Sequence, residues 1–284
     1  MKSIEIIHPG ISSSIQDGGR VGYAFYAIPR SGVMDYQAYE SIKSLLELSE
    51  YCTVIECTLQ APKIQFNEVF TIVISGADMH WKINGNPVEL DTVVRVRQGD
   101  LLTGGFAQSG FRGYIGFADE MKVTRHYKSA SAYSYASLGA NNGQALNKGQ
   151  RIQFTEKKHP TPTESLKPKR KNNQAIIIHK GPEYDWIVKA KKSVLISNEF
   201  RISPQSNRMG ARLLGPEINV KQHMTSSVPV LPGFIQLLPS GQLIVLLQDG
   251  QTTGGYPRIA YLDIEALSAF NQVAIGKSVR FELE

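Results

Sequence analysis

The sequence predicts a mainly β protein with few, short helices. Short apolar runs rich in β-branched residues recur along the 284-residue chain, which is typical of strands. Gly, Pro, Asn and Asp separate these runs at short intervals, as in β-sandwiches and barrels. Helical segments are too few to provide the crossovers that a parallel α/β sheet needs.

The first predicted strand lies within Met1–Gly10, where three Ile occur in four positions. Two alternating segments that follow glycine turns, Gly149–Phe154 and Gly276–Phe281, predict the last strand of each half of the chain. The other predicted strands are Phe70–Ser75, Thr92–Val96, Gly113–Phe117, Ser193–Ile196, Ile235–Leu237 and Leu243–Leu247.

Two segments have helical spacing. Met34–Leu48 places apolar residues on one face, and Asp35 stands near its start, where the helix dipole favours a carboxylate. Leu262–Phe270 is the second predicted helix, with Asp263 as its N-cap.

A segment rich in Lys, Pro, Thr and Asn divides the chain. We predict an N-terminal β-rich half at 1–156, a linker or long loop at 157–174 and a C-terminal β-barrel half at 175–284. The halves share three short motifs in the same order: an Ile-Ile-His opening, a Leu-x-x-Pro-x-Ile segment and the closing glycine turn with its strand. These matches suggest two related supersecondary units.

The formal net charge is +6, and much of the excess lies on the dividing segment. Residues 156–172 hold six Lys or Arg against two Glu, without interleaved aromatic residues for base stacking, so a solvated linker is favoured over a nucleic-acid site. Two cysteines are too few for a disulfide framework, and no apolar run approaches the length of a membrane span. We therefore expect a cytoplasmic protein without a bound metal, nucleic acid or membrane.

A glycine-rich loop, Gln248–Arg258, follows the apolar run Leu243–Leu247. It carries an Asp, two Gln, two Thr, a Tyr and an Arg around three glycines, which is chemically denser than a hairpin turn requires. Successive N–H groups in such a loop can bind an anion. The Tyr256–Pro257 bond is a candidate for the cis form.

Three further clusters carry polar groups. Ser12–Arg20 joins Asp17 and Arg20 across two glycines: Arg20 either grips a carboxylate or phosphate, or pairs with Asp17 in a tight turn. Ile28–Asp35 enters the first predicted helix and either binds an anion or merely caps that helix. Ser203–Pro216 places Arg208 and Arg212 around Gly210.

Several established motifs are missing from the sequence. It has no nucleophile elbow, no zinc-protease helix, no Walker loop and no strand-linked Gly-x-Gly-x-x-Gly. Nucleotide binding by this chain alone is therefore not supported.

These clusters resemble the allophanate hydrolase subunit 2 family, also called the biotin-dependent carboxyltransferase C-terminal type, which includes KipA and the C subunit of prokaryotic 5-oxoprolinase. The matching segments are Ile15–Arg20, Ser31–Asp35, Ile55–Leu59, Ser206–Pro216, Pro229–Gln236 and Gln248–Arg258.

The resemblance implies a cyclophilin-like β-barrel architecture and a pocket shared with a KipI-like partner of the allophanate hydrolase subunit 1 type. For the 5-oxoprolinase branch it implies a LamB/YcsF-type third subunit and ATP, used in the assembled complex. The catalytic candidates are Asp17, Asp249 and Arg208. The candidates for binding substrate or an anion are Arg20, Asp35, Asn207, Gln251, Thr252, Gly254, Gly255, Tyr256 and Arg258.

The central part of the chain departs from the family pattern. Ala118-Asp119-Glu120 replaces a glycine pair, and Ala130 and Gln144 stand where the family has Arg. Losing two guanidiniums and gaining two carboxylates is expected to weaken an anion site there.

Three functions follow from the resemblance. The first is a subunit of ATP-dependent 5-oxoprolinase, with Asp17 or Asp249 as general base and Arg20, Arg208 and Arg258 holding a carboxylate or phosphoryl group. The second is carboxyl transfer from carboxybiotin to a urea-like amide. The third is a non-catalytic, KipA-like module that antagonises a kinase inhibitor.

Overall fold

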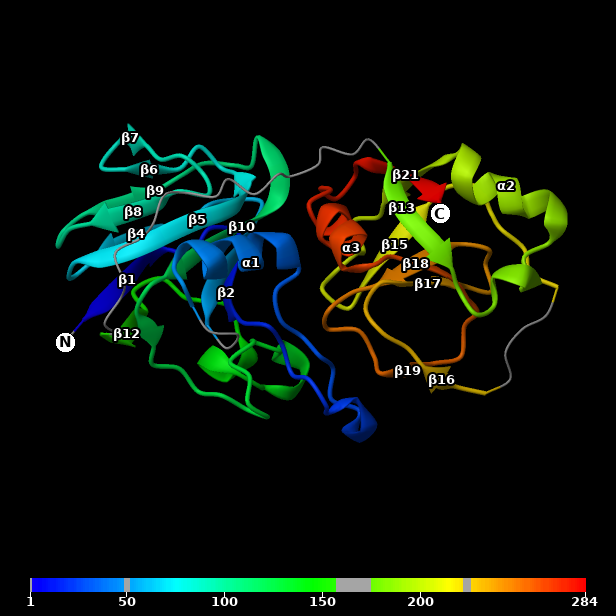
Figure 1. Ribbon diagram of the computed structural model, residues 1–284, viewed down its shortest axis with the longest axis horizontal. Helices are drawn as coiled ribbons and strands as arrows, with labels where there is room; N and C mark the ends of the chain where they lie inside the picture. The colour runs from blue at the N-terminus through cyan, green and yellow to red at the C-terminus, as the bar shows by residue number, and fades with distance from the viewer. Residues whose placement is uncertain (1, 49–51, 157–174, 222–225) are drawn as a thin grey trace. The chain divides into compact units, whose positions relative to one another are not determined.

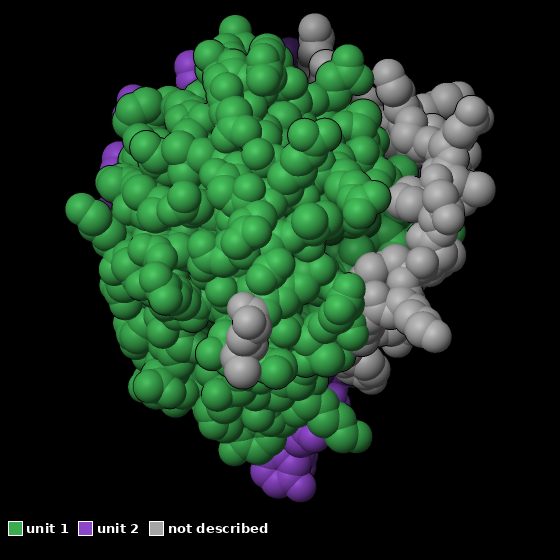
Figure 2. Space-filling model, turned by 90° about the vertical axis from the view of Figure 1, so that its left-hand side faces the viewer, with its two compact units in different colours: residues 1–20, 35–170 green, residues 21–34, 171–284 purple. Residues whose placement is uncertain are grey.

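The chain forms two compact units, drawn in different colours in Figure 2. The computed structural model describes residues 2–48, 52–156, 175–221 and 226–284. Unit 1 comprises residues 1–20 and 35–170, and unit 2 comprises residues 21–34 and 171–284. The predicted linker, 157–174, lies outside the described residues. The segment 21–34, which we assigned to the N-terminal half, belongs instead to unit 2.

The described residues of unit 1 form two antiparallel sheets and one α-helix. The strands are β1 Ser3–His8, β2 Ser12–Gln16, β3 Val54–Thr58, β4 Lys63–Phe66, β5 Phe70–Asp78, β6 Lys82–Ile83, β7 Asn86–Pro87, β8 Val93–Val96, β9 Leu101–Thr103, β10 Ser109–Phe117, β11 Glu120–Met121 and β12 Arg151–Thr155. The helical segments are α1 Tyr36–Leu45 and the 3-10 turns η2 Ser134–Ala136 and η3 Ala140–Gly143.

One sheet of unit 1 has the strand order β11-β12-β1-β4-β9-β6-β7, and the other has the order β2-β3-β10-β5-β8. Helix α1 packs against β5 and β10 of the second sheet (Figure 1). This close approach depends on Gly116, because a Cβ at that position would lie 2.1 Å from Cγ2 of Ile42. Strand β2, at the edge of the second sheet, leads directly into the turn at Asp17.

The described residues of unit 2 form a closed barrel with two α-helices. Its elements are η1 Ala24–Tyr26, β13 Ile176–Lys180, η4 Tyr184–Trp186, α2 Lys189–Ser197, β14 Glu199–Ile202, β15 Gly210–Leu214, β16 Val228–Pro229, β17 Phe234–Leu237, β18 Leu243–Leu246, β19 Thr253–Gly254, β20 Arg258–Tyr261, α3 Ile264–Asn271 and β21 Ser278–Leu283. Seven strands close the barrel in the order β13-β20-β17-β18-β15-β14-β21. Strands β16 and β19 form a separate two-stranded ribbon.

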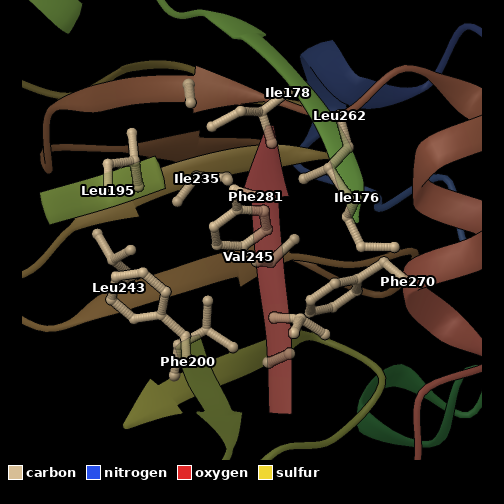
Figure 3. Packing of buried hydrophobic residues seen from close by; sticks show 14 of the residues in the cluster. Ile176, Ile178, Leu195, Phe200, Ile235, Leu243, Val245, Leu262, Phe270 and Phe281 are labelled. Carbon is tan, nitrogen blue, oxygen red and sulfur yellow. The ribbon is translucent and has the colours of Figure 1, made fainter. Parts of the chain in front are cut away.

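The barrel interior is filled by alternating side chains of these strands, as expected for a small barrel. Figure 3 shows Phe281 of β21 among side chains from β13, β14, β17 and β18. The rings of Phe200 and Phe281 lie 5.8 Å apart, centre to centre. Met34, from the segment 21–34, belongs to the same buried cluster. That segment is therefore part of the core of unit 2.

The mainly β prediction, with a barrel, is confirmed. The predicted helices correspond to α1 and α3, and their N-caps are as expected: Asp35 accepts from Ala38 N at 3.0 Å and Asp263 from Ala266 N at 2.8 Å. The closing strands of the two sequence halves pair differently, however. Strand β12 is antiparallel to β1, whereas β21 is parallel to β13. The shared motifs therefore do not extend to the same strand pairing.

One predicted strand, Ser193–Ile196, is wrong. These residues form the end of helix α2, which begins at Lys189. Leu195 is buried and packs into the barrel cluster, while its neighbours are partly or fully exposed. An apolar run this short is compatible with either a strand or a helix, and packing decides between them.

Candidate functional site

The turn after β2 is organised around Asp17, which is 1% exposed. Its carboxylate accepts hydrogen bonds from Ser129 Oγ, Ser131 Oγ and Ala130 N, each at 2.6 Å. It also accepts from Gly19 N at 2.9 Å, which closes the turn on itself. Asp17 therefore binds the 129–131 segment to the turn with several charge-assisted bonds.

Two arginines of unit 1 surround this network. Arg125 Nη1 lies 3.3 Å from Asp17 Oδ2 and is half-buried, so it supplies a guanidinium that the sequence motifs did not single out. Arg20 is 2% exposed and donates to the carbonyl oxygen of Ser131. This burial and the bond to Ser131 favour a structural role for Arg20 over anion binding, and the predicted pairing of Arg20 with Asp17 stays a prediction.

The structure shows the surroundings of the residues that depart from the family pattern. Ala130 is completely buried and uses its backbone N–H to bind Asp17, so the position contributes through the main chain. Asp119 forms an ion pair with Lys2 at 2.8 Å. This gained carboxylate is therefore compensated, which corrects the expectation that it repels an anion. Glu120 and Gln144 are exposed.

Asp35 begins helix α1 of unit 1. Besides capping that helix, its backbone N–H donates to Tyr114 Oη at 2.8 Å, and that hydroxyl donates to Glu56 Oε2 at 2.8 Å. Burial, with the nearby Glu56 charge, raises the pKa of Tyr114 well above its ordinary value, so the phenol stays protonated. The capping interpretation of Asp35 is the one supported by the geometry.

In unit 2 the centre of the candidate site is an ion pair between Arg208 and Asp249. Arg208 Nε lies 2.8 Å from Asp249 Oδ2, and Nη2 lies 3.4 Å from Oδ1, so the guanidinium faces both carboxylate oxygens. Asp249 N also donates to the Arg208 carbonyl at 2.9 Å. Asn207 shapes the Arg208 loop, because its Oδ1 accepts from Met209 N and Gly210 N.

The segment 21–34 is attached to this ion pair. Arg208 Nη2 donates to the Gly32 carbonyl at 2.5 Å, and Ser31 N donates to the Gln248 carbonyl at 2.7 Å. Ser31 has a φ of 53°, a conformation that non-glycine residues seldom adopt and that is often found at functional sites. The Ser31–Asp35 and Gln248–Arg258 motifs are thus brought together in unit 2 through residues 31 and 32.

The rest of the glycine-rich loop contributes β19 to the two-stranded ribbon with β16, and then forms the turn that follows. Gln251 and Tyr256 are exposed, whereas Thr252 and the two glycines, Gly254 and Gly255, are half-buried. The Thr252 carbonyl accepts from Val230 N at 3.0 Å. No peptide bond is cis in the part of the chain that the structure describes, so the prediction of a cis Tyr256–Pro257 bond is wrong.

Arg258 has a different set of partners from the one predicted. Its guanidinium binds both carboxylate oxygens of Glu183, at 3.0 and 2.8 Å, and the Pro229 carbonyl at 2.9 Å. Burial alone would raise the pKa of Glu183, but the hydrogen bonds from Arg258 outweigh it and hold that pKa below its usual value. To bind a substrate anion, Arg258 would have to give up these bonds. Nothing in the sequence around Glu183 indicated this partnership.

The structure therefore places the predicted residues in two clusters. Unit 1 contains Asp17, Arg20 and Asp35; unit 2 contains Asn207, Arg208, Asp249, Gln251, Thr252, Gly254, Gly255, Tyr256 and Arg258.

Three further features bear on the kind of site that this chain could contain. Within residues 2–48, 52–156, 175–221 and 226–284, no group of three or more His, Cys, Asp or Glu could hold a metal ion. Both cysteines are free thiols, and burial raises the pKa of Cys52 to about 11. No helix in these ranges is long and apolar enough to cross a membrane.

Comparison with known proteins identifies relatives over nearly the whole chain. Residues 26–283 match the family model described as "Carboxyltransferase domain, subdomain A and B". The chain is 29% identical to the 5-oxoprolinase C subunit of Escherichia coli and 30% identical to that of Haemophilus influenzae, covering 98% of this chain and 90% of each relative.

Larger proteins contain a similar region. Urea amidolyase of Lachancea kluyveri is 25% identical over 98% of this chain, which spans 17% of that protein. The crystal structure of Kluyveromyces lactis urea carboxylase superimposes with a TM-score of 0.90 at 22% identity, covering 98% of this chain and 27% of that one. This structural likeness shows the shared fold.

Proposed function

The chain belongs to the carboxyltransferase domain family, subdomains A and B, and we propose that it is the C subunit of an ATP-dependent 5-oxoprolinase. This enzyme would open the lactam of 5-oxoproline to glutamate, together with a KipI-like subunit and a LamB/YcsF-like subunit. The relatives named as 5-oxoprolinase C subunits, which match 98% of the chain, support this interpretation. The proposal rests on the ion pair between Arg208 and Asp249, in which Asp249 lies near the start of the glycine-rich loop.

In this proposal Asp249 is the acid–base residue. Its carboxylate is held by two bonds from Arg208, and Arg208 is itself fixed by the Gly32 carbonyl. A carboxylate oriented in this way can position a water molecule or accept a proton at a lactam carbonyl. Asp17, whose oxygens are engaged by five donors of its own unit, Arg125 among them, is assigned a positioning role.

Arg258 is neutralised by Glu183, and Arg208 by Asp249, so these two guanidiniums of the unit 2 site are already compensated. We therefore assign ATP binding to the other subunits of the complex. The role proposed for Asp249 does not involve ATP.

The test is reconstitution. The chain, its two candidate partner subunits and ATP are mixed with 5-oxoproline, and glutamate is measured. Asp249→Asn should lower kcat by at least about 100-fold, because it removes the charge that activates water. Asp185→Asn, which alters an exposed ion pair with Lys192, is the matched control and should retain the wild-type rate.

Unchanged turnover in Asp249→Asn would remove Asp249 from the mechanism. No glutamate from the complete mixture would remove the 5-oxoprolinase function itself. Co-purification with the KipI-like protein without turnover of any amide would instead select the non-catalytic, KipA-like function.

Carboxyl transfer to a urea-like amide is the second candidate, favoured by the urea amidolyase relatives. It predicts that the chain, supplied with carboxybiotin and urea together with its KipI-like partner, consumes carboxybiotin. Carboxybiotin consumption without ATP-dependent glutamate formation would replace the first proposal by this one.

A further inference from the structure

The three most exposed large apolar side chains that the structure describes lie within six residues of unit 2. They are Phe25, Val21 and Tyr26, which are 94%, 74% and 69% exposed. Single exposed apolar residues are normal on a protein surface, but a group of them marks a candidate interaction site. Phe25 contributes almost no packing to its own chain, so the stability of unit 2 does not account for an aromatic residue at this position.

The backbone holds these side chains in a defined turn, residues 21–27, which we call the η1 turn. Two backbone hydrogen bonds of 3.0 Å, each between residues three apart, close it. Ala27 ends the turn with a φ of 58°. The rings of Phe25 and Tyr26 meet edge to face, 5.6 Å apart between their centres. Side chains that are already ordered lose less entropy on binding, which favours their use as anchors in a partner.

The η1 turn leads directly into the candidate site of unit 2. Ser31 N donates to the Gln248 carbonyl at 2.7 Å. The next residue, Gly32, accepts from Arg208 Nη2 through its carbonyl oxygen. Six residues lead from Tyr26 to Gly32, so their Cα atoms are at most about 22 Å apart. A protein bound to the η1 turn would therefore stand at the edge of the ion pair formed by Arg208.

The turn is large enough to anchor a protein interface. An aromatic side chain buries roughly 150–250 Å², so covering Phe25, Tyr26 and Val21 would bury about 400 Å² of this chain. That is about half of the roughly 800 Å² that each partner contributes to an interface of standard size. Aromatic residues are also enriched in such interfaces.

The occupant that these observations favour is the KipI-like subunit. The proposed function places a second protein beside the Arg208–Asp249 pair, and a second copy of this chain on the η1 turn would occupy the same edge. In urea amidolyase the matching region is one part of a much longer chain, so other protein segments are joined to it there. Arg30 is the one charged residue in 21–34, which suits an apolar groove on the partner.

We propose that the η1 turn is the docking element for the KipI-like subunit, with Phe25 and Tyr26 inserted into an apolar groove of that subunit. The inference rests on the proposed function and names the residues through which this chain would hold its partner. Docking at this turn would link assembly of the complex to completion of the site.

Titration of the full chain with the KipI-like subunit, followed by isothermal titration calorimetry, tests the contribution of the turn. Phe25→Ser and Tyr26→Ser should each weaken binding by about 30-fold or more, as expected for an aromatic anchor. Both side chains are exposed, so urea unfolding of the two variants should match the wild type. Phe106→Ser is the matched control, because Phe106 of unit 1 is also exposed, at 59%, and this variant should bind like the wild type.

Photo-crosslinking identifies the occupant. Phe25→p-benzoylphenylalanine, mixed with the KipI-like subunit, should give a crosslink to that subunit, whereas Phe106→p-benzoylphenylalanine should give none. A crosslink from position 25 to a second copy of this chain, or to another part of the same chain, overturns the inference.

Equal binding of the wild type, Phe25→Ser and Tyr26→Ser also overturns it, as does equal weakening by Phe106→Ser or the absence of any binding to the KipI-like subunit. The proposed function fails separately. If the subunit binds through the η1 turn but the complete mixture forms no glutamate, the inference is retained and the 5-oxoprolinase activity is lost. If glutamate forms while both serine variants bind normally, the function stands and the inference is lost.

Discussion

Arg258 donates three hydrogen bonds to the carboxylate of Glu183, two from its guanidinium and one from its backbone N–H, the last at 2.8 Å. The pair joins β20 to the turn before η4. Both side chains are largely buried, so removing either partner leaves the other without compensation. Arg258 therefore contributes to the shape of the barrel end that presents the glycine-rich loop.

This pair predicts a pH-dependent stability. The pKa of Glu183 is lowered in the folded protein, so its contribution is fully present above the unfolded pKa of about 4.3 and is lost as the pH falls through the folded value. Glu183→Gln should lower the free energy of unfolding by about 2 kcal/mol at pH 7. The difference from wild type should shrink below about pH 4.

Urea unfolding at a series of pH values measures this difference. Asp185→Asn, on the neighbouring exposed ion pair, is the control and should change little. A Glu183→Gln deficit that stays constant from about pH 7 to about pH 3 would contradict the role of the charge.

At the scale of elements, the contact between helix α1 and strand β10 is set by a glycine. The Cβ that Gly116 lacks would overlap the side chain of Ile42, which is itself completely buried. The α1 N-terminus is fixed at the same time by the Asp35 cap. The helix is therefore positioned by one close approach and one cap.

Gly116→Ala should destabilise the protein by about 1–3 kcal/mol through overpacking, and Ile42→Ala by about 2–5 kcal/mol through a cavity. The double variant should cost less than the sum, since the smaller residue 42 makes room for the new methyl group. Thermal and urea unfolding of the four proteins measure the coupling. Simple additivity would show that the two residues are not in contact.

The elements also show how far the sequence could be interpreted. Caps such as Asp35 and Asp263 are local, and the sequence predicts them because their hydrogen bonds span three residues. The run Ser193–Ile196 is too short to distinguish a helical period from a strand period.

The residues of the candidate site also differ in whether the sequence alone could predict their contacts. The sequence grouped Asp249 with the glycine-rich loop, as it is in the structure, because these residues are consecutive. It did not predict that Arg125 faces Asp17 or that Glu183 holds Arg258, since these partners are 108 and 75 residues apart. Long-range ion pairs depend on strand order, which sequence motifs do not encode.

At the scale of the whole molecule, the chain leaves unit 1 after Arg20, contributes residues 21–34 to unit 2 and returns to unit 1 at Asp35. The segment is anchored by Met34 in the barrel cluster and by the bond from Asn271 Nδ2 to the Met34 carbonyl at 2.8 Å. Unit 2 is therefore incomplete when it is cut out as a continuous piece of sequence.

A fragment of residues 171–284 should consequently melt at a lower temperature and less cooperatively than the same fragment joined by a flexible linker to residues 21–34. Burying Met34 alone is worth about 1.5–3 kcal/mol, which is a large part of the stability of a small domain. Circular dichroism of the two fragments measures the difference. Identical melting curves would show that the segment is not required.

The same segment has a consequence for synthesis on the ribosome. Met34 and Asn271 are 237 residues apart, so at typical translation rates roughly 10–50 s separate their emergence. Throughout this interval Met34 has no barrel to enter, and it leaves the ribosomal tunnel as an apolar side chain exposed to solvent. The barrel partner of this early segment is made 237 residues later, so unit 2 reaches its final form only after Asn271 has been translated.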